Sequence, residues 1–137
     1  MSASAQPAMY SIPAKTSKGV VTTVGALIGG KVALIVNTAS ACGFTPQLKG
    51  LQELQSSLGP ENFTVVAYPC NQFGAQEPGS NEQIEQFCST RFASTFPIMD
   101  KVNVNEPNVD PLWAHLKAKK SGFLGFDAVK WNFTFVR

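Results

Sequence analysis

Hydrophobic and polar positions follow two periods along this chain, and these periods predict strands and helices in alternation. Residues 32–36, VALIV, form a continuous apolar run that ends at Asn37, which indicates a central strand covered on both faces. Residues 63–68 predict a second strand. Between the two, Thr45-Pro46 is typical of a helix start with Thr45 as the N-cap, and Gly59-Pro60 is typical of a helix end. The apolar positions at helical spacing in this segment are Leu48, Leu51, Leu54 and Leu58.

Two more helices are predicted further along the chain. After a loop over residues 69–79, a helix is expected over residues 80–92, and Ser80 and Gln83 form a capping box at its start. The apolar residues on one side of this helix are Ile84, Phe87, Cys88 and Phe92. Residues 111–120 predict the other helix. Its inward-facing residues are Leu112, Trp113 and Leu116.

The order of the elements predicts an α/β fold. Residues 9–23 suit a small hairpin that turns at Lys18-Gly19, and residues 131–136, which are aromatic and β-branched, suit a final strand. Strands that alternate with helices favour right-handed crossovers and a mixed, mostly parallel central sheet flanked by helices. Because we find no internal repeat and no linker, residues 1–137 are expected to form a single domain, with residues 1–8 flexible.

Composition and charge exclude several classes of function. The chain has 137 residues, of which 44% are hydrophobic and 15% charged, and this suits one small globular core. Lys and Arg number 11 against 9 for Asp and Glu, so the positive field of a nucleic-acid surface or a polybasic membrane anchor is missing. The apolar runs are too short to span a bilayer, and the N-terminal stretch lacks the pattern of a signal peptide. We expect a cytosolic protein, with a mitochondrial address as the alternative because the first residues include no acid.

The three cysteines, Cys42, Cys70 and Cys88, are far apart in the sequence and form no CxxC pair. With His115 as the single histidine, they do not match the ligand spacing of a zinc site. An odd number of cysteines in a chain without a secretory signal is not typical of a disulfide-stapled scaffold. The pattern favours thiols that stay reduced or react.

Cys42 lies where reactive groups collect in α/β sheets, between the strand at residues 32–36 and the helix that Thr45-Pro46 opens. A thiolate in this position faces unpaired backbone N–H groups and the positive end of a helix dipole. Both lower the pKa of a cysteine from about 8.5 toward neutrality. The alternative is a small, half-buried cysteine without a chemical role. Position by itself leaves the two interpretations open.

Three segments of the sequence resemble the three signature segments of glutathione peroxidases. They are NTASACGFTP at residues 37–46, YPCNQFGAQEPG at residues 68–79 and KWNF at residues 130–133. Three separate motifs at the family's spacings are far more specific than one short pattern. The resemblance, which runs from Lys31 to Phe133, implies a thioredoxin-like fold and a peroxidase.

The resemblance also implies a catalytic tetrad, in which Cys42 is the peroxidatic nucleophile and Gln76, Trp131 and Asn132 surround it. Side-chain amides and an indole N–H donate hydrogen bonds to a thiolate without titrating themselves. Such donors favour the charged sulfur, and they also stabilise charge that grows on the leaving oxygen of a peroxide. Taken alone, each of the three partners is better explained as an ordinary loop, core or strand-end residue. Only the joint pattern favours the tetrad.

Selenium-dependent members of the family have selenocysteine at the position of Cys42, so the chain resembles the cysteine-containing branch, which implies no selenium and no other cofactor. This branch implies Cys88 as the resolving cysteine, although helical spacing alone would make it an ordinary core residue. Part of the helix at residues 80–92 then has to unwind, because a disulfide requires Cα atoms within about 7 Å. We interpret Cys70 as structural, with resolution by Cys70 as the alternative. A resolving cysteine favours thioredoxin over glutathione as the external thiol reductant.

The sequence departs from the family at its end. Family members continue past the Trp-Asn strand into another strand and a C-terminal helix, whereas this sequence ends at Arg137. We therefore expect a C-terminally truncated form, monomeric but with a sheet edge open to self-association.

The leading hypothesis is a thiol peroxidase that reduces hydrogen peroxide and organic hydroperoxides. Cys42 becomes a sulfenic acid, Cys88 condenses with it to a disulfide, and thioredoxin reduces the disulfide. The first alternative is a peroxide sensor that relays oxidation from Cys42 to a partner protein. The second is an inactive truncated isoform.

Overall fold

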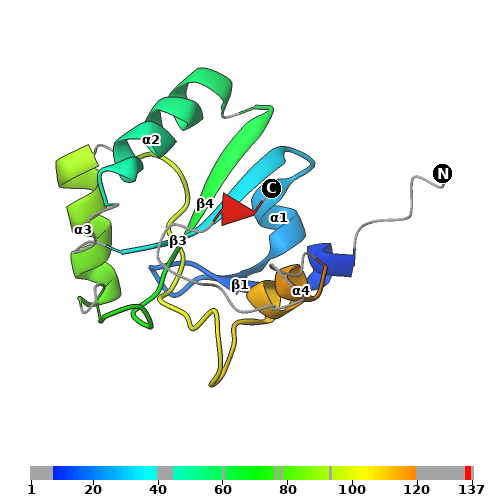
Figure 1. Ribbon diagram of the computed structural model, residues 1–137. Coiled ribbons are helices and arrows are strands. Elements are labelled where there is room, and N and C mark those ends of the chain that lie inside the picture. Colours follow the sequence, from blue (N-terminus) through cyan, green and yellow to red (C-terminus); the bar gives the residue numbers. More distant parts are fainter. Residues whose placement is uncertain are drawn as a thin grey trace.

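The computed structural model describes residues 8–39, 45–59, 61–75, 77, 79–92, 94–119 and 135–136. Helices and strands alternate along these residues (Figure 1). In chain order they are η1 (Ala8–Ser11), β1 (Pro13–Lys15), β2 (Val21–Thr23), α1 (Val24–Ile28), β3 (Val32–Thr38), α2 (Gln47–Leu58), β4 (Phe63–Pro69), α3 (Asn81–Phe92), α4 (Pro111–Lys119) and β5 (Phe135–Val136). Sequence reasoning missed α1, a short helix that Thr23 caps by accepting the backbone N–H of Ala26 at 3.2 Å.

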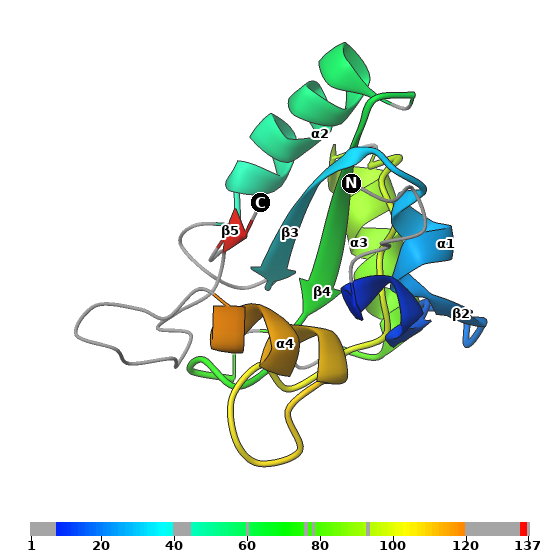
Figure 2. The same ribbon diagram turned by 90° about the vertical axis from the view of Figure 1, so that its right-hand side faces the viewer.

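The central sheet has the order β4-β3-β5. β3 and β4 are parallel, with Val32 opposite Phe63 at one end and Thr38 opposite Pro69 at the other. Their arrowheads lie at the same end of the sheet (Figure 2). β5 pairs antiparallel with Ile35 and Val36 of β3. The predicted central strand and the mixed character of the sheet are confirmed, and β3 extends beyond the predicted residue 36 to Thr38.

The predicted N-terminal hairpin is also confirmed. β1 and β2 pair antiparallel, and Gly19 in the turn has a positive φ of 84°, which glycine adopts without strain. The hairpin joins the sheet through the segment at residues 97–100. Ser17 donates its N–H to the Ile98 carbonyl at 3.0 Å, and Ala67 of β4 donates to the Pro97 carbonyl at 3.0 Å.

Helices cover both faces of the central sheet. Figure 1 shows α2 and α3 on one side of β3 and β4, and α1 and α4 on the other. Neighbouring residues of a strand point to opposite faces, so the strands contribute to two buried clusters. The cluster on the side of α2 and α3, called the α2–α3 cluster below, contains Val36, Ala39, Leu48, Leu51, Val65, Ala67, Ile84, Cys88 and Phe96. The opposite cluster includes Ile35, Val66, Tyr68, Cys70, Met99, Leu112, Trp113 and Leu116.

α2 differs from its prediction at the start and along its exposed side. Pro46, not Thr45, holds the N-cap position, and it makes no side-chain cap. The four-leucine stripe is wrong in its second half, because Leu54 and Leu58 are 41% and 51% exposed. Gln55, which follows Leu48 by two helical turns, takes the inward position instead and accepts the backbone N–H of Val65 at 2.8 Å.

α3 and α4 match their predictions closely. The capping box is present, since Ser80 donates its N–H to Gln83 Oε1 at 2.9 Å and Gln83 donates its N–H to Ser80 Oγ at 3.2 Å. Residues on the predicted inner side of α3 pack into the α2–α3 cluster. The predicted inner residues of α4, which are Leu112, Trp113 and Leu116, are buried.

Parts of the predicted architecture lie outside the described residues. Of the strand predicted at residues 131–136, only Phe135–Val136 is described, as β5. The flexible N-terminus predicted at residues 1–8 is almost wholly outside, and the single-domain organisation stays a prediction. Among the described residues, no helix is long and apolar enough to cross a membrane.

Candidate active site

Three chain segments include the four residues of the predicted tetrad in their sequence, and described residues of each segment lie on β3 or are bonded to residues near its carboxyl end. Cys42, Gln76, Trp131 and Asn132 themselves lie outside the described residues. The residues next to them in the sequence that the structure does describe show where the ends of each segment lie.

The first segment connects β3 to α2 and includes Cys42 in its sequence. Its described ends are held together, because Thr45 Oγ1 donates a hydrogen bond to the Ala39 carbonyl at 2.9 Å. Both residues are buried. This bond explains why Thr45 does not cap α2: its hydroxyl points back to the strand. Pro46 at the N-cap position makes no side-chain cap, and the N–H groups of Leu48 and Lys49 donate to the carbonyls of Thr45 at 2.9 Å and Pro46 at 3.1 Å.

The second segment follows β4 and includes Gln76. Cys70 donates its N–H to the Thr38 carbonyl at 3.1 Å, which ties the start of this loop to the end of β3. Asn71 Oδ1 then accepts the backbone N–H of Glu77 at 2.8 Å. The two residues on either side of Gln76, Ala75 and Glu77, are thus in a loop anchored beside β3.

The third segment leads to β5 and includes Trp131 and Asn132. Because β5 is antiparallel to β3, its first residue Phe135 pairs with Val36, closer to the carboxyl end of β3 than the Ile35–Val136 pair. Trp131 and Asn132 precede Phe135 in the sequence. All three tetrad segments therefore have a described end on β3 or on the residues bonded to it.

Sequence reasoning missed Glu77, a carboxylate that is only 1% exposed. A buried acidic side chain is rare, because removing a charge from water is costly unless it is paired or hydrogen-bonded. The sequence feature that could have identified it is its position directly after Gln76 in the second signature segment. Glu77 therefore belongs to the surroundings of the candidate site.

Cys70 has the environment of a structural cysteine. It is 0% exposed, and its Sγ donates to Gln72 Oε1 at 3.5 Å. Burial raises the pKa of the Cys70 thiol, and the charge of Glu77 adds to the rise, while hydrogen bonds around Gln72 and Val104 oppose it. A protonated, buried thiol is a poor nucleophile. These observations favour the structural interpretation of Cys70 over the alternative that it resolves.

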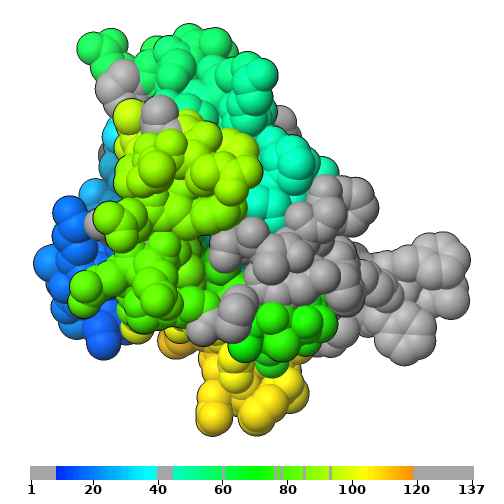
Figure 3. Space-filling model, turned by 90° about the vertical axis from the view of Figure 1, so that its left-hand side faces the viewer, coloured from blue at the N-terminus to red at the C-terminus, as the bar shows by residue number. Residues whose placement is uncertain are grey.

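Cys88 lies on the inner side of α3, as predicted, and is 4% exposed. Figure 3 shows that the outer side of α3 is at the molecular surface. Cys88 belongs to the same buried cluster as Ala39, which precedes Cys42 by three residues in the sequence. Its resolving role stays a prediction.

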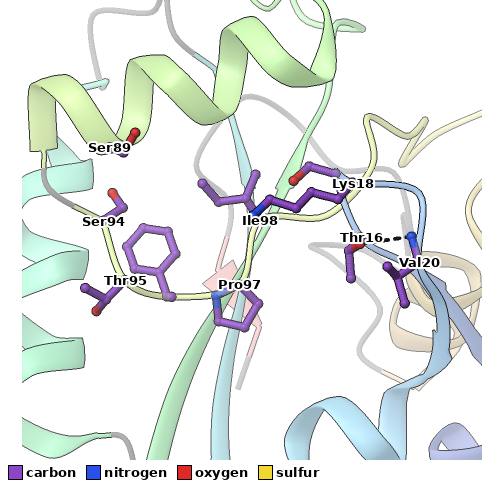
Figure 4. A pocket seen from close by; sticks show the side chains of 10 residues that line it. Thr16, Lys18, Val20, Ser89, Ser94, Thr95, Pro97 and Ile98 are labelled. Atoms are coloured by element: carbon purple, nitrogen blue, oxygen red, sulfur yellow. Dashed lines mark hydrogen bonds between the residues drawn. The ribbon is translucent and has the colours of Figure 1, made fainter.

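Other features of the described residues do not belong to this site. A cavity of about 490 Å³ lies between the hairpin turn and the residues that follow α3. Figure 4 shows Lys18 reaching across it from the turn toward Ile98, and none of the predicted site residues line it. Within the described ranges, no group of three or more His, Cys, Asp or Glu side chains is arranged to hold a metal ion.

Comparison with solved structures defines the class of the fold. The structure of GPX1 from T. cruzi matches with a TM-score of 0.73 and 32% identity, over 94% of this chain and 77% of that one. A thioredoxin from Wuchereria bancrofti matches with a TM-score of 0.52 and 15% identity, over 86% of this chain and 74% of that one. The predicted thioredoxin-like α/β fold is confirmed.

Comparison of sequences identifies the family. The family model named Glutathione peroxidase matches residues 9–117. The glutathione peroxidase-like peroxiredoxin HYR1 of Saccharomyces cerevisiae is 57% identical over 76% of this chain, and the hydroperoxy fatty acid reductase gpx1 of Synechocystis is 56% identical over 77%. The chain belongs to the glutathione peroxidase family. It spans 64% of the yeast protein and 65% of the cyanobacterial one. The match to the family model ends before Trp131 and Asn132.

Proposed function

We propose that the protein is a cysteine-dependent thiol peroxidase in which Cys42 reduces hydroperoxides. The observation that carries the proposal is the convergence of three chain segments at the carboxyl end of β3. Each segment includes tetrad residues in its sequence, and each has a described end there. The two relatives, a glutathione peroxidase-like peroxiredoxin and a hydroperoxy fatty acid reductase, support the same chemistry.

The first step is attack of the Cys42 thiolate on one oxygen of the peroxide bond. The S–O bond forms as the O–O bond breaks, so the sulfur is oxidised to a sulfenic acid and the other oxygen leaves as water or an alcohol after it gains a proton. Gln76, Trp131 and Asn132 donate hydrogen bonds to the thiolate and to the leaving oxygen. None of the three exchanges protons in the process.

The second step joins Cys88 to the sulfenic acid, with a disulfide and water as the products. Because Cys88 is buried on the inner side of α3, the helix has to open locally before the two sulfurs meet. The last turn is the obvious part to open. Just beyond this turn, Ser94 donates its N–H to the Cys88 carbonyl at 3.3 Å, the longest such turn or loop bond among the described residues.

An external dithiol then reduces the disulfide and restores both cysteines. We propose a thioredoxin-like reductant, because reduction of an intramolecular disulfide suits a dithiol better than glutathione. The substrates are hydrogen peroxide and organic hydroperoxides. A cytosolic location and a monomeric state stay predictions.

Peroxide-dependent NADPH oxidation, coupled through thioredoxin and thioredoxin reductase, tests the function. Cys42→Ser should abolish turnover, whereas Cys70→Ser, the matched cysteine control, should leave it near the parent rate. An unchanged rate in Cys42→Ser would refute the proposal. Mass spectrometry after one equivalent of peroxide should show a disulfide between Cys42 and Cys88. A disulfide between Cys42 and Cys70 would instead reassign the resolving step.

A further inference from the structure

The side chain of Asn71 closes the loop that includes Gln76. Asn71 Oδ1 accepts the N–H of Glu77 at 2.8 Å, and that nitrogen is covalently bonded to the carbonyl carbon of Gln76. Asn71 follows Cys70, whose own N–H donates to the Thr38 carbonyl at 3.1 Å. One side chain therefore links the peptide that follows Gln76 to the carboxyl end of β3.

The backbone just before Gln76 has an unusual conformation. Gly74 and Ala75 have positive φ angles of 65° and 52°. Glycine adopts this region freely, but for alanine it is strained, and strained residues persist only where their surroundings hold them. The hydrogen bond between Asn71 and Glu77 spans this strained pair, so it is one of the contacts that hold it.

Gln72 ties the same loop to a second segment of chain. Its Oε1 accepts the N–H groups of Val104 at 2.8 Å and Asn105 at 2.9 Å. Its Nε2 donates to the carbonyls of Asn105 at 2.7 Å and Glu106 at 3.2 Å. Both ends of the amide are used, so the loop cannot shift past this segment without breaking several hydrogen bonds.

We propose that Asn71 and Gln72 are positioning residues for the Gln76 carboxamide. They hold the backbone on the two sides of Gln76, so that its side chain is in place to donate to the Cys42 thiolate and the peroxide. This inference rests on the proposed function, in which Gln76 is such a donor. Within the described part of the chain, the hydrogen bonds of the two side chains go to Cys70, Glu77 and the segment at residues 104–106, so the proposed role of Asn71 and Gln72 is to position and not to react.

The test measures the second-order rate constant for oxidation of Cys42 in a single turnover of the full chain. Asn71→Ala should lower this constant about tenfold or more, because a misplacement of about 1 Å in a reacting constellation costs up to about 100-fold. Gln72→Ala should lower it as well. Asn71→Asp keeps an oxygen acceptor for the Glu77 N–H, so its rate should stay closer to that of the parent than the rate of Asn71→Ala does.

Asn81→Ala is the control, because Asn81 Oδ1 also accepts a backbone N–H, that of Lys101, at 3.1 Å and outside the loop, and its Nδ2 donates to Asp100 as well. It should lower the thermal midpoint about as much as Asn71→Ala and leave the rate of Cys42 oxidation unchanged. Equal slowing in both variants would mean that general destabilisation is the cause, and the positioning role would be wrong.

A double-mutant cycle separates this inference from the proposed function. In a Gln76→Ala background, Asn71→Ala should have no further effect on the rate, because the donor that it positions is gone. Independent, multiplying effects would overturn the positioning role alone. If Gln76→Ala by itself leaves the rate unchanged, then both the tetrad and this inference are wrong. If Gln76→Ala slows the reaction while Asn71→Ala and Gln72→Ala do not, only this inference is wrong.

Discussion

The buried hydroxyl of Tyr68 allows a sharp test of the packing beneath the site. Tyr68 is 1% exposed, and among the described residues its hydroxyl has no hydrogen-bond partner. The ring packs edge-on against Trp113, with centroids 6.2 Å apart and planes at 86°. Burial raises the pKa of Tyr68, and the negative charge of Asp110 raises it further, so the hydroxyl stays protonated. Tyr68→Phe removes this hydroxyl and keeps the ring contact.

The expected effect follows from the cost of an unsatisfied polar group. Burying a hydroxyl without a hydrogen bond costs about 1–3 kcal/mol, whereas the ring itself is equally buried in the variant. The free energy of unfolding of Tyr68→Phe should therefore equal that of the parent or exceed it by up to about 2 kcal/mol. A gain of 1 kcal/mol would raise the thermal midpoint by about 2–8 °C.

Urea unfolding followed by circular dichroism measures this difference. Gln55→Leu is the contrasting control, because Gln55 is 7% exposed and its Oε1 accepts the Val65 N–H at 2.8 Å. Leucine would leave that N–H unsatisfied, so this variant should lose about 1–3 kcal/mol. A loss of more than about 1 kcal/mol in Tyr68→Phe would refute the reasoning, since it would mean that the hydroxyl is bonded in solution.

Three further predictions concern Cys70, Cys88 and Asp110. Because burial raises the pKa of Cys70, iodoacetamide at neutral pH should leave Cys70 unmodified in the native protein, and rapid native labelling would contradict this. Ser80→Ala breaks the capping box of α3, which should cost about 1 kcal/mol and speed the alkylation of Cys88, as mass spectrometry would measure. Burial also raises the pKa of the Asp110 carboxyl in the folded state above its value in the unfolded chain. The free energy of unfolding therefore includes a contribution from protonated Asp110 at low pH, and this contribution is lost as the pH rises through the raised pKa. Asp110→Asn keeps an acceptor for the N–H groups of Leu112 and Trp113, so its stability relative to the parent should rise between acid and neutral pH, and urea titrations at both would show it.

The fold was predictable wherever the spacing of apolar residues in the sequence matches the side chains that the structure buries. In the run at residues 32–36, Ile35 and Val36 are buried on opposite faces because helices cover both faces of β3 there, whereas Val32 at the start of the strand is 56% exposed. The period of α3 matches its one buried side. The prediction of α2 was wrong in the second half of the helix, where the spacing of apolar residues does not match the side chains that are buried. Leu54 and Leu58 have helical spacing but are exposed, while a polar residue, Gln55, is buried because a strand amide needs its side-chain oxygen.

The residues proposed for the candidate site come from the sequence, whereas the hydrogen bonds proposed to hold one of them in place come from the structure. Cys42 and Gln76 are recognisable from local motifs. The proposed role of Asn71 depends on the hydrogen bond from the Glu77 N–H to its side chain, which closes the loop across the positive φ of Ala75. The hydrogen bonds of Gln72 could not be predicted from local sequence, because its partners lie some thirty residues further along the chain. No pattern of polar and apolar residues around Glu77 in the sequence predicts that its side chain is buried.

The sequence by itself determined the order of the strands and helices apart from α1, and it determined the family, because periodicity and motifs are local properties of the chain. Cys42 as the reactive thiol stays a prediction from the same motifs. Only the tertiary structure decided which polar groups face each other at the end of β3. Thr45 illustrates the reason: its sequence context predicts a helix cap, yet its hydroxyl donates to Ala39 instead. A side-chain hydrogen bond depends on which backbone atoms folding brings within about 3 Å, and that distance is set by the packing of the whole sheet and its helices.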